Sequence, residues 1–215
     1  MASEIGVKSA DFKFSTSLQK EGEILFLLSD CPGIIRCYGE DISDEKGKRV
    51  YNLLLEFAPG GSLKSLNERR GGALPESEVR RYTRMILKAL SYVHEKGYVH
   101  CDIKPHNILV FPSQDGNRNY VKIADFGLAK KADEGNGLND DRRLMGHTRG
   151  TLPYASPESI YCLEHEQVAS GYLGSWVHGI ADDDRTTSLG VQGQARAETQ
   201  DSYWERATQN SKYHV

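Results

Sequence analysis

The feature that most constrains this chain is a set of polar residues at fixed spacing in the stretch HCDIKPHNILV. Asp102 lies two residues after His100, Lys104 two residues further on, and Asn107 five residues after Asp102. With about 5% usage of each residue type, such a set arises by chance in roughly one chain in a thousand of this length. A second motif, DFG at 125–127, directly follows the apolar segment YVKIA. The probability that both motifs occur in one chain by chance is negligible.

The residue types in these motifs are those that phosphoryl transfer requires. That reaction needs a carboxylate that orients the acceptor, oxygen ligands for a metal ion, and cations spread over the phosphates. The motifs supply these types in order along the chain. The alternative interpretation of Asp102 is an ordinary loop aspartate that caps a turn, and the fixed spacing makes it the weaker one.

Composition excludes several other classes of function. The 215 residues carry a formal net charge of −3, which gives no general attraction for nucleic acid or anionic membranes. Four cysteines occur without a CxxC pair, so a reducing compartment fits best. No apolar run approaches membrane-spanning length, and the N-terminal stretch has no apolar signal-peptide core. We expect an intracellular protein of the cytoplasm, with the nucleus as a second compartment, that binds no nucleic acid and has no membrane span.

Apolar periodicity predicts strands and one helix in the first part of the chain. The helix is expected at 17–30, with Leu18, Leu25 and Leu28 on one face. The charged segment 40–49 is expected to form a solvated turn between two strands. The strands predicted over the whole chain are 6–9, 33–40, 49–58, 98–100, 107–111 and 120–124.

A short helix is expected around 62–66, and the most regular helix of the chain follows Pro75. Pro75 suits the first turn of this helix, and Gly97 suits a left-handed C-terminal cap. From Asp125 to Glu158 the chain is expected to be loop-like. The apolar positions of the helix recur at three- and four-residue spacing: Val79, Tyr82, Ile86, Leu90 and Val93.

The two motifs resemble those of the eukaryotic protein kinases, H-R-D-x-x-x-x-N and D-F-G. The resemblance runs from about Gly6 to Glu158 and is strongest to the MAP kinase kinase kinases (the STE-like group) of plants. It implies a serine/threonine protein kinase that uses ATP and Mg²⁺ and phosphorylates a protein substrate, a downstream kinase in a MAP kinase cascade. The segments that carry it are VKSA, SLQKE, LLLEFAPGGSL, HCDIKPHNILVF, VKIADFGLAK and GTLPYASPES.

The resemblance assigns the catalytic residues. It implies that Asp102 orients the substrate hydroxyl and that Lys104 lies beside the transferring phosphate. Asn107 and Asp125 would hold the two Mg²⁺ ions. The pattern D-x-K-x-x-N is typical of Ser/Thr rather than Tyr kinases. Thr151, in GTLPY, would lie near Asp102 and shape the acceptor site.

Lys8 matches the strand lysine of V-A-I-K, with Gly6 in place of the alanine. Its expected partner is Glu21 on the following helix, and this ion pair would position Lys8 on the α- and β-phosphates. Single lysines and glutamates more often lie on solvated faces, and Glu23 is a competing choice of partner that faces away from Glu21.

The segment LLLEFAPGG resembles the hinge between kinase lobes. The resemblance implies that Leu55 is the gatekeeper and that the backbone of Glu56 and Ala58 hydrogen-bonds to adenine. Leu109 would form the floor of the adenine pocket, although a core leucine is an equally good description of it.

The chain also departs from the family pattern. Cys101 replaces the H-R-D arginine, so we expect a different requirement for activation-segment phosphorylation, since cysteine cannot pair with a phosphate. No glycine-rich loop precedes Lys8, and no D-x-W helix follows Glu158. The expected fold is therefore an incomplete α+β two-lobed kinase fold that lacks the first two N-lobe strands and the C-lobe helices after the activation segment. The predicted units are a partial N-lobe at 1–58, a partial C-lobe at 59–165, and a tail at 166–215.

The tail is interpreted as a frameshifted stretch. When the codons for 171–185 are chosen suitably and translated one base later, with the first base of the Thr186 codon added, they give DIWAAGCTVLLMMTG, which is similar to the D-x-W helix of the family. One step is forced, because Trp176 is TGG and Val177 begins with G, which together yield glycine. We expect the tail to be disordered. Sequencing the coding DNA for residues 160–190 tests this interpretation.

Three functions therefore remain open from the sequence. The first is a Ser/Thr protein kinase of which this chain is an incomplete copy. The second is a catalytically impaired pseudokinase or scaffold, which the intact residues from Lys8 to Asp125 argue against. The third is a kinase fragment without function.

Overall fold

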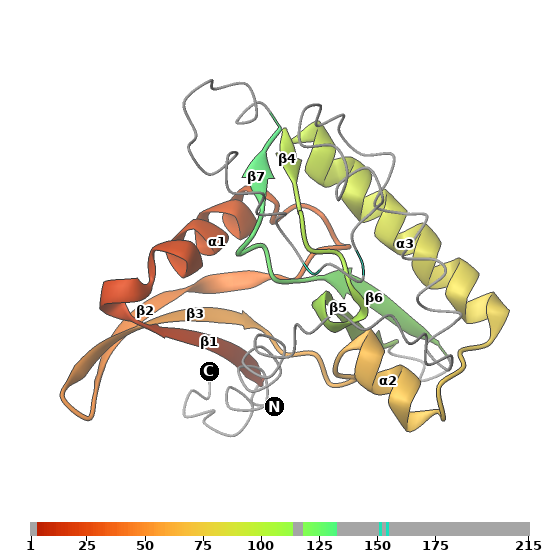
Figure 1. Cartoon of the computed structure of the whole chain (residues 1–215), viewed down its shortest axis with the longest axis horizontal. Helices are drawn as coiled ribbons and strands as arrows, with labels where there is room; N and C mark the ends of the chain where they lie inside the picture. Colours follow the sequence, from red (N-terminus) through yellow and green to blue (C-terminus); the bar gives the residue numbers. More distant parts are fainter. Residues whose placement is uncertain (1–3, 114–117, 133–150, 152–153, 155–215) are drawn as a thin grey trace, which may run out of the picture.

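The computed structural model describes residues 4–113, 118–132, 151 and 154. The predicted tail, the boundary at residue 165, the frameshift interpretation and Ser156–Glu158 lie outside these residues. Figure 1 shows a strongly twisted sheet and helix α1 on one side, with the longer helix α3, helix α2 and short strands on the other. This is the two-lobed α+β arrangement that the sequence predicts. No helix among the described residues is long and apolar enough to cross a membrane.

The sheet is antiparallel, with the strand order β1-β3-β2. β1 (Ile5–Asp11) pairs with β3 (Lys48–Glu56) from Ile5 opposite Glu56 to Asp11 opposite Val50. β2 (Cys37–Glu45) pairs with the other edge of β3.

The predicted boundaries of β2 are wrong at both ends. The strand does not begin at Gly33 but at Cys37, and it continues to Glu45 through the segment predicted as a turn. The reason is a strict alternation of exposed and half-buried residues from Cys37 to Ser43, which is the pattern of a strand with one solvated face. Only Lys46 and Gly47 form the turn, both at positive φ.

Helix α1 (Thr16–Leu27) follows a short 3₁₀ turn at Phe12–Phe14 and packs against the sheet. The predicted apolar face is confirmed, because Leu18, Leu25 and Leu28 are all buried. Gly22 brings the helix close to β3: a Cβ atom there would lie 2.9 Å from Leu53 Cδ1. This close approach sets the position of the adjacent Glu21.

The described residues after β3 form two α-helices and two small antiparallel sheets of two strands each. All five predicted apolar positions of α3 face inward: Tyr82, Ile86, Leu90 and Val93 are buried, and Val79 is packed against the same core. Pro75 lies just before the helix rather than in its first turn, and Gly97 follows the helix at φ 76° as predicted. The elements are α2 (Leu63–Arg69), α3 (Glu76–Glu95), β4 (Tyr98–Val99), a 3₁₀ turn (Pro105–Asn107), β5 (Ile108–Pro112), β6 (Asn119–Ile123) and β7 (Lys130–Lys131).

The hairpin of β5 and β6 places the two sequence motifs side by side. Ile108 pairs with Ile123, so the residues just before β5 and just after β6 lie at the same end of the hairpin. β7 was predicted as loop, but its two residues pair with β4. A two-residue strand carries too little periodicity to be recognised from sequence.

Candidate active site

Lys8 lies in the middle of β1 and forms two short ion pairs. Its Nζ is 2.7 Å from Glu21 Oε2 and 2.8 Å from Asp125 Oδ1. The pair with Glu21 is the one expected from the sequence. The contact with Asp125, which lies 117 residues away, was not predicted. Three ionisable groups from β1, α1 and the DFG motif therefore meet at one point.

The Lys8 ammonium and the two carboxylates attract each other, which opposes the cost of burying their charges. Burial opposes the charged form of Lys8, but the Glu21 and Asp125 carboxylates raise its pKa above the ordinary value. Burial also opposes ionisation of Asp125, yet the Lys8 ammonium holds the pKa of Asp125 below its usual range. Burial is the stronger influence on Glu21 and raises its pKa. Lys8 and Asp125 are thus held firmly in their charged forms.

Asp102 is fixed by hydrogen bonds to both of its carboxylate oxygens. The Thr151 hydroxyl and the Thr151 backbone N–H donate to Oδ1 at 2.8 and 3.1 Å. Lys104 Nζ lies 3.0 Å from Oδ2 and also donates to the Thr151 hydroxyl at 2.9 Å. The expectation that Thr151 lies near Asp102 is confirmed. Asp102 and Lys104 are both buried, so this cluster has a defined geometry.

His100 joins the two motifs through its ring. Nε2 lies 3.1 Å from the Ala124 carbonyl, and Nδ1 accepts the Asp102 backbone N–H at 3.2 Å. These two bonds require a neutral ring that is protonated on Nε2. Burial favours that state by lowering the pKa of His100. No role was predicted for His100 beyond its place in the motif, and its fixed spacing from Asp102 was the one signal that indicated a role.

Asn107 is positioned by the same loop. Its Nδ2 donates to the Asp102 carbonyl at 2.9 Å and to Asp102 Oδ2 at 3.0 Å. The backbone carbonyl of Asn107 accepts the N–H of Ala124, the residue before Asp125, at 2.8 Å. Because the amide nitrogen makes both side-chain bonds, the side-chain oxygen of Asn107 is the atom suited to bind a cation.

The residues fit the magnesium ions that the family uses. Asn107 and Asp125 supply an amide oxygen and a carboxylate, which are the hard donors that Mg²⁺ prefers. No group of three or more His, Cys, Asp or Glu side chains in the described part of the chain could hold a metal by itself. Mg²⁺ is usually held by one or two carboxylates together with substrate phosphates.

The predicted hinge residues follow β3. Leu55 and Leu109 are buried, and Ala58 is half-buried. The Glu56 N–H donates to the Arg36 carbonyl at 2.8 Å, so a bond from the Glu56 backbone to adenine would have to use its carbonyl oxygen. A Cβ atom on Gly60 would lie 2.5 Å from the Val110 carbonyl oxygen, so only glycine allows this approach of the hinge to β5.

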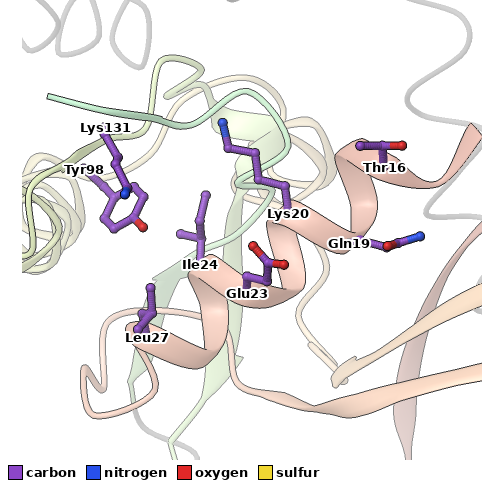
Figure 2. A pocket seen from close by; sticks show the side chains of 8 residues that line it. All are labelled: Thr16, Gln19, Lys20, Glu23, Ile24, Leu27, Tyr98 and Lys131. Atoms are coloured by element: carbon purple, nitrogen blue, oxygen red, sulfur yellow. The ribbon is translucent and has the colours of Figure 1, made fainter. Parts of the chain in front are cut away.

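A separate surface pocket of about 410 Å³ lies beside α1, and Figure 2 shows the side chains that line it. The helical period of 3.6 places Glu23 on the side of α1 opposite Glu21, so Glu23 lines this pocket and does not face Lys8. The competing assignment of Glu23 as the partner of Lys8 is therefore wrong. The pocket contains no predicted site residue; it is lined by Thr16, Gln19, Lys20, Glu23, Ile24, Leu27, Tyr98 and Lys131.

The fold and these clusters have the arrangement of a protein kinase domain, and the comparison with known families agrees. The protein kinase domain matches residues 4–181, a range that runs past the boundary expected at residue 165. The chain belongs to the protein kinase family.

Its relatives narrow the class further. It is 48% identical to mitogen-activated protein kinase kinase kinase 20 of Arabidopsis thaliana over 178 residues, which are 82% of this chain and 48% of that protein. It is 44% identical to mitogen-activated protein kinase kinase kinase 17 of the same plant, over 60% of this chain and 33% of that one. Mitogen-activated protein kinase kinase 7, also of Arabidopsis thaliana, is 41% identical over 78% of this chain and 48% of that protein. The chain thus spans half or less of the length of these relatives.

Proposed function

We propose that this chain carries the catalytic centre of a serine/threonine protein kinase that transfers phosphate from ATP to a downstream kinase of a MAP kinase cascade. The observation that carries the proposal is the meeting of Lys8, Glu21 and Asp125 beside the Asp102 cluster. The names of the most similar relatives support the cascade. We further propose that the protein acts inside the cell.

Each residue of the site has a task in this reaction. Asp102 would accept or orient the proton of the substrate hydroxyl. Thr151 holds its Oδ1 in place, and Lys104 and Asn107 hold its Oδ2. Lys104 would lie between that carboxylate and the transferring phosphate and offset its developing charge. Lys8 would bind the α- and β-phosphates, with Glu21 holding its ammonium in position.

Mg²⁺, bound by Asn107 and Asp125, would supply charge neutralisation for the phosphates. The acceptor is proposed to be serine or threonine because Lys104 follows Asp102 in the D-x-K pattern, and because Thr151 closes around the same carboxylate.

The test is the replacement Asp125→Asn in the full chain, with casein as a model substrate and Mg·ATP as the donor. Loss of one charged metal ligand is expected to lower the rate by about a hundred- to a thousand-fold, as is typical of single electrostatic contacts to a transition state. Asp44→Asn, at an exposed position of β2, is the matched control and should keep the rate within about two-fold. Activity of Asp125→Asn within a few-fold of the parent would contradict the assignment.

A thermal melt with and without Mg·ATP separates the two alternatives. A melting temperature that rises with Mg·ATP supports the kinase, and one that ignores the nucleotide supports a scaffold. The absence of a cooperative melt indicates a fragment that does not fold alone.

A further inference from the structure

Glu56 and Lys122 form an ion pair that neither the motif roles nor the proposed chemistry uses. Lys122 Nζ donates to both carboxylate oxygens of Glu56, at 2.9 Å to Oε1 and 2.6 Å to Oε2. Glu56 is the last residue of β3, and Lys122 lies in β6, so the pair joins the sheet of the first lobe to a hairpin of the second.

The pair is well shielded from water. The Lys122 side chain is 13% exposed and that of Glu56 is 20% exposed. The Lys122 ammonium lies 5.1 Å from the centre of the Phe111 ring, which itself stacks on Tyr120 with ring centres 5.4 Å apart. At this exposure, water screens the attraction less than in a surface pair, and the ring faces hold the lysine stem in one direction.

Glu56 is also held from the opposite side. Its backbone N–H donates to the Arg36 carbonyl at 2.8 Å, and its Oε2 accepts the Arg36 backbone N–H at 3.2 Å. Both the backbone and the side chain of Glu56 are therefore fixed. Lys122 provides the one charged contact to this carboxylate that the described residues show.

The position of Lys122 connects this pair to the predicted adenine pocket. Lys122 lies directly opposite Leu109 in the β5–β6 ladder, and directly opposite residues of an antiparallel pair share a face. Leu109 is the residue expected to form the floor of the pocket, and Glu56 begins the hinge. The ion pair therefore sets the position of the hinge backbone relative to the floor.

We propose that Lys122 is a positioning residue for nucleotide binding, acting through Glu56 to hold the hinge in the geometry that accepts adenine. The proposal rests on the proposed function, because it needs a nucleotide in this site. Among the described residues, the Lys122 ammonium bonds to Glu56 and to no residue of the Lys8 or Asp102 clusters, so its removal affects the affinity for nucleotide more than the transfer step. A pre-organised site binds more tightly because less ordering accompanies binding.

The experiment compares Lys122→Met and Lys122→Arg with Lys64→Met in the full chain. Lys64 pairs with Glu68 at 3.6 Å on the exposed surface of α2, so the same substitution there is a matched control. The dissociation constant of Mg·ADP is measured by calorimetric titration, and KM for ATP and kcat are measured with casein. Lys122→Met is expected to raise the dissociation constant and KM about ten-fold, equivalent to about 1.4 kcal/mol, with kcat changed less than about two-fold.

Lys122→Arg should restore affinity to within about two- to three-fold, because its guanidinium also binds a carboxylate in bidentate fashion. Glu56→Gln, which keeps the hinge backbone and the carbonyl, provides a second route if Lys122→Met folds poorly; it should weaken Mg·ADP as Lys122→Met does. The positioning role is overturned if Lys122→Met or Glu56→Gln binds Mg·ADP as tightly as the Lys64→Met control does. The kinase assignment is unaffected by that result. A parent chain that folds but does not bind Mg·ADP overturns both.

Discussion

Replacement of Lys8 by methionine should destabilise the fold as well as abolish phosphate binding. Lys8 is the shared cation of Glu21 and Asp125, whose side chains are only 2% and 10% exposed. Without Lys8, two carboxylates remain close together in a site where water cannot solvate them. Removing one partner of a buried pair costs about 3–5 kcal/mol, and the 20% exposure of the Lys8 side chain points to the lower end, about 3 kcal/mol.

The loss should depend on pH and should be partly repaired by a second change. Burial already raises the pKa of Glu21, and in Lys8→Met it rises further because the opposing ammonium is gone. An acid whose folded pKa lies above its unfolded value near 4.5 destabilises the fold increasingly as pH rises above that value, so the penalty should be larger at pH 7 than at pH 5. The double replacement Lys8→Met/Glu21→Gln also removes one of the two carboxylate charges left unpaired. It should recover about 1–2 kcal/mol of the free energy of unfolding, because the effects of replacing two residues in contact do not add.

The assay is urea unfolding of the full chain at 25 °C, followed by far-ultraviolet circular dichroism at pH 5 and pH 7. Lys64→Met, in an exposed pair, should lie within about 0.5 kcal/mol of the parent. The reasoning is refuted if Lys8→Met is as stable as Lys64→Met at pH 7, or if the double replacement is no more stable than Lys8→Met alone.

Two further predictions concern the stability of the fold. Gly6→Ala should stabilise it by about 0.5–1 kcal/mol in urea unfolding, because a Cβ atom there meets its nearest neighbour, the Leu55 carbonyl oxygen, at an ordinary 3.7 Å and strand glycine is entropically unfavourable; a loss of stability would contradict this. The pKa of His100 is lowered in the folded state, so at pH values below the ordinary histidine pKa of 6.5 the unfolded chain binds one more proton than the folded chain. The free energy of unfolding should therefore decrease as the pH falls, by up to about 1.4 kcal/mol per pH unit. Comparison of urea unfolding at pH 7.5 and 5.5 should show this slope in the parent and a smaller one in His100→Gln; equal slopes would contradict it.

The sequence predicted much of the site because its motifs lie next to regular elements. Asp102 and Asn107 precede β5, and Asp125 follows β6, so strands recognised from apolar runs also locate the functional residues. Glu21 was assigned from the resemblance to the kinase family, and the helix that carries it was recognised from its apolar face, with Leu18 and Leu25 buried. Periodicity therefore predicts the elements, and the resemblance predicts which of their residues carry the function.

The unpredicted contacts depend on tertiary packing. Lys8 to Asp125 and Glu56 to Lys122 each join residues of different lobes, and neither spacing nor propensity encodes which opposite charges meet. The extension of β2 was missed for a related reason. Its charged residues resemble a turn in composition, and only pairing with β3 selects the extended conformation.

The backbone of the catalytic loop shows why Cys101 can replace an arginine there without displacing Asp102. Cys101 and Asp125 have φ angles of 66° and 64°, a left-handed conformation that costs a non-glycine residue about 1–3 kcal/mol. Both are held there by hydrogen bonds around them: His100 bonds to Ala124 and to the Asp102 N–H, and Lys8 bonds to Asp125. None of these bonds uses the side chain of residue 101, which is buried and donates to the Val99 carbonyl at 3.5 Å. The backbone of Asp102 is therefore held by the neutral, buried His100 ring, and this bond requires neither an arginine at position 101 nor a phosphate on the activation segment. This geometry gives a physical basis for the expectation that the residue at 101 affects the response to phosphorylation rather than the chemistry.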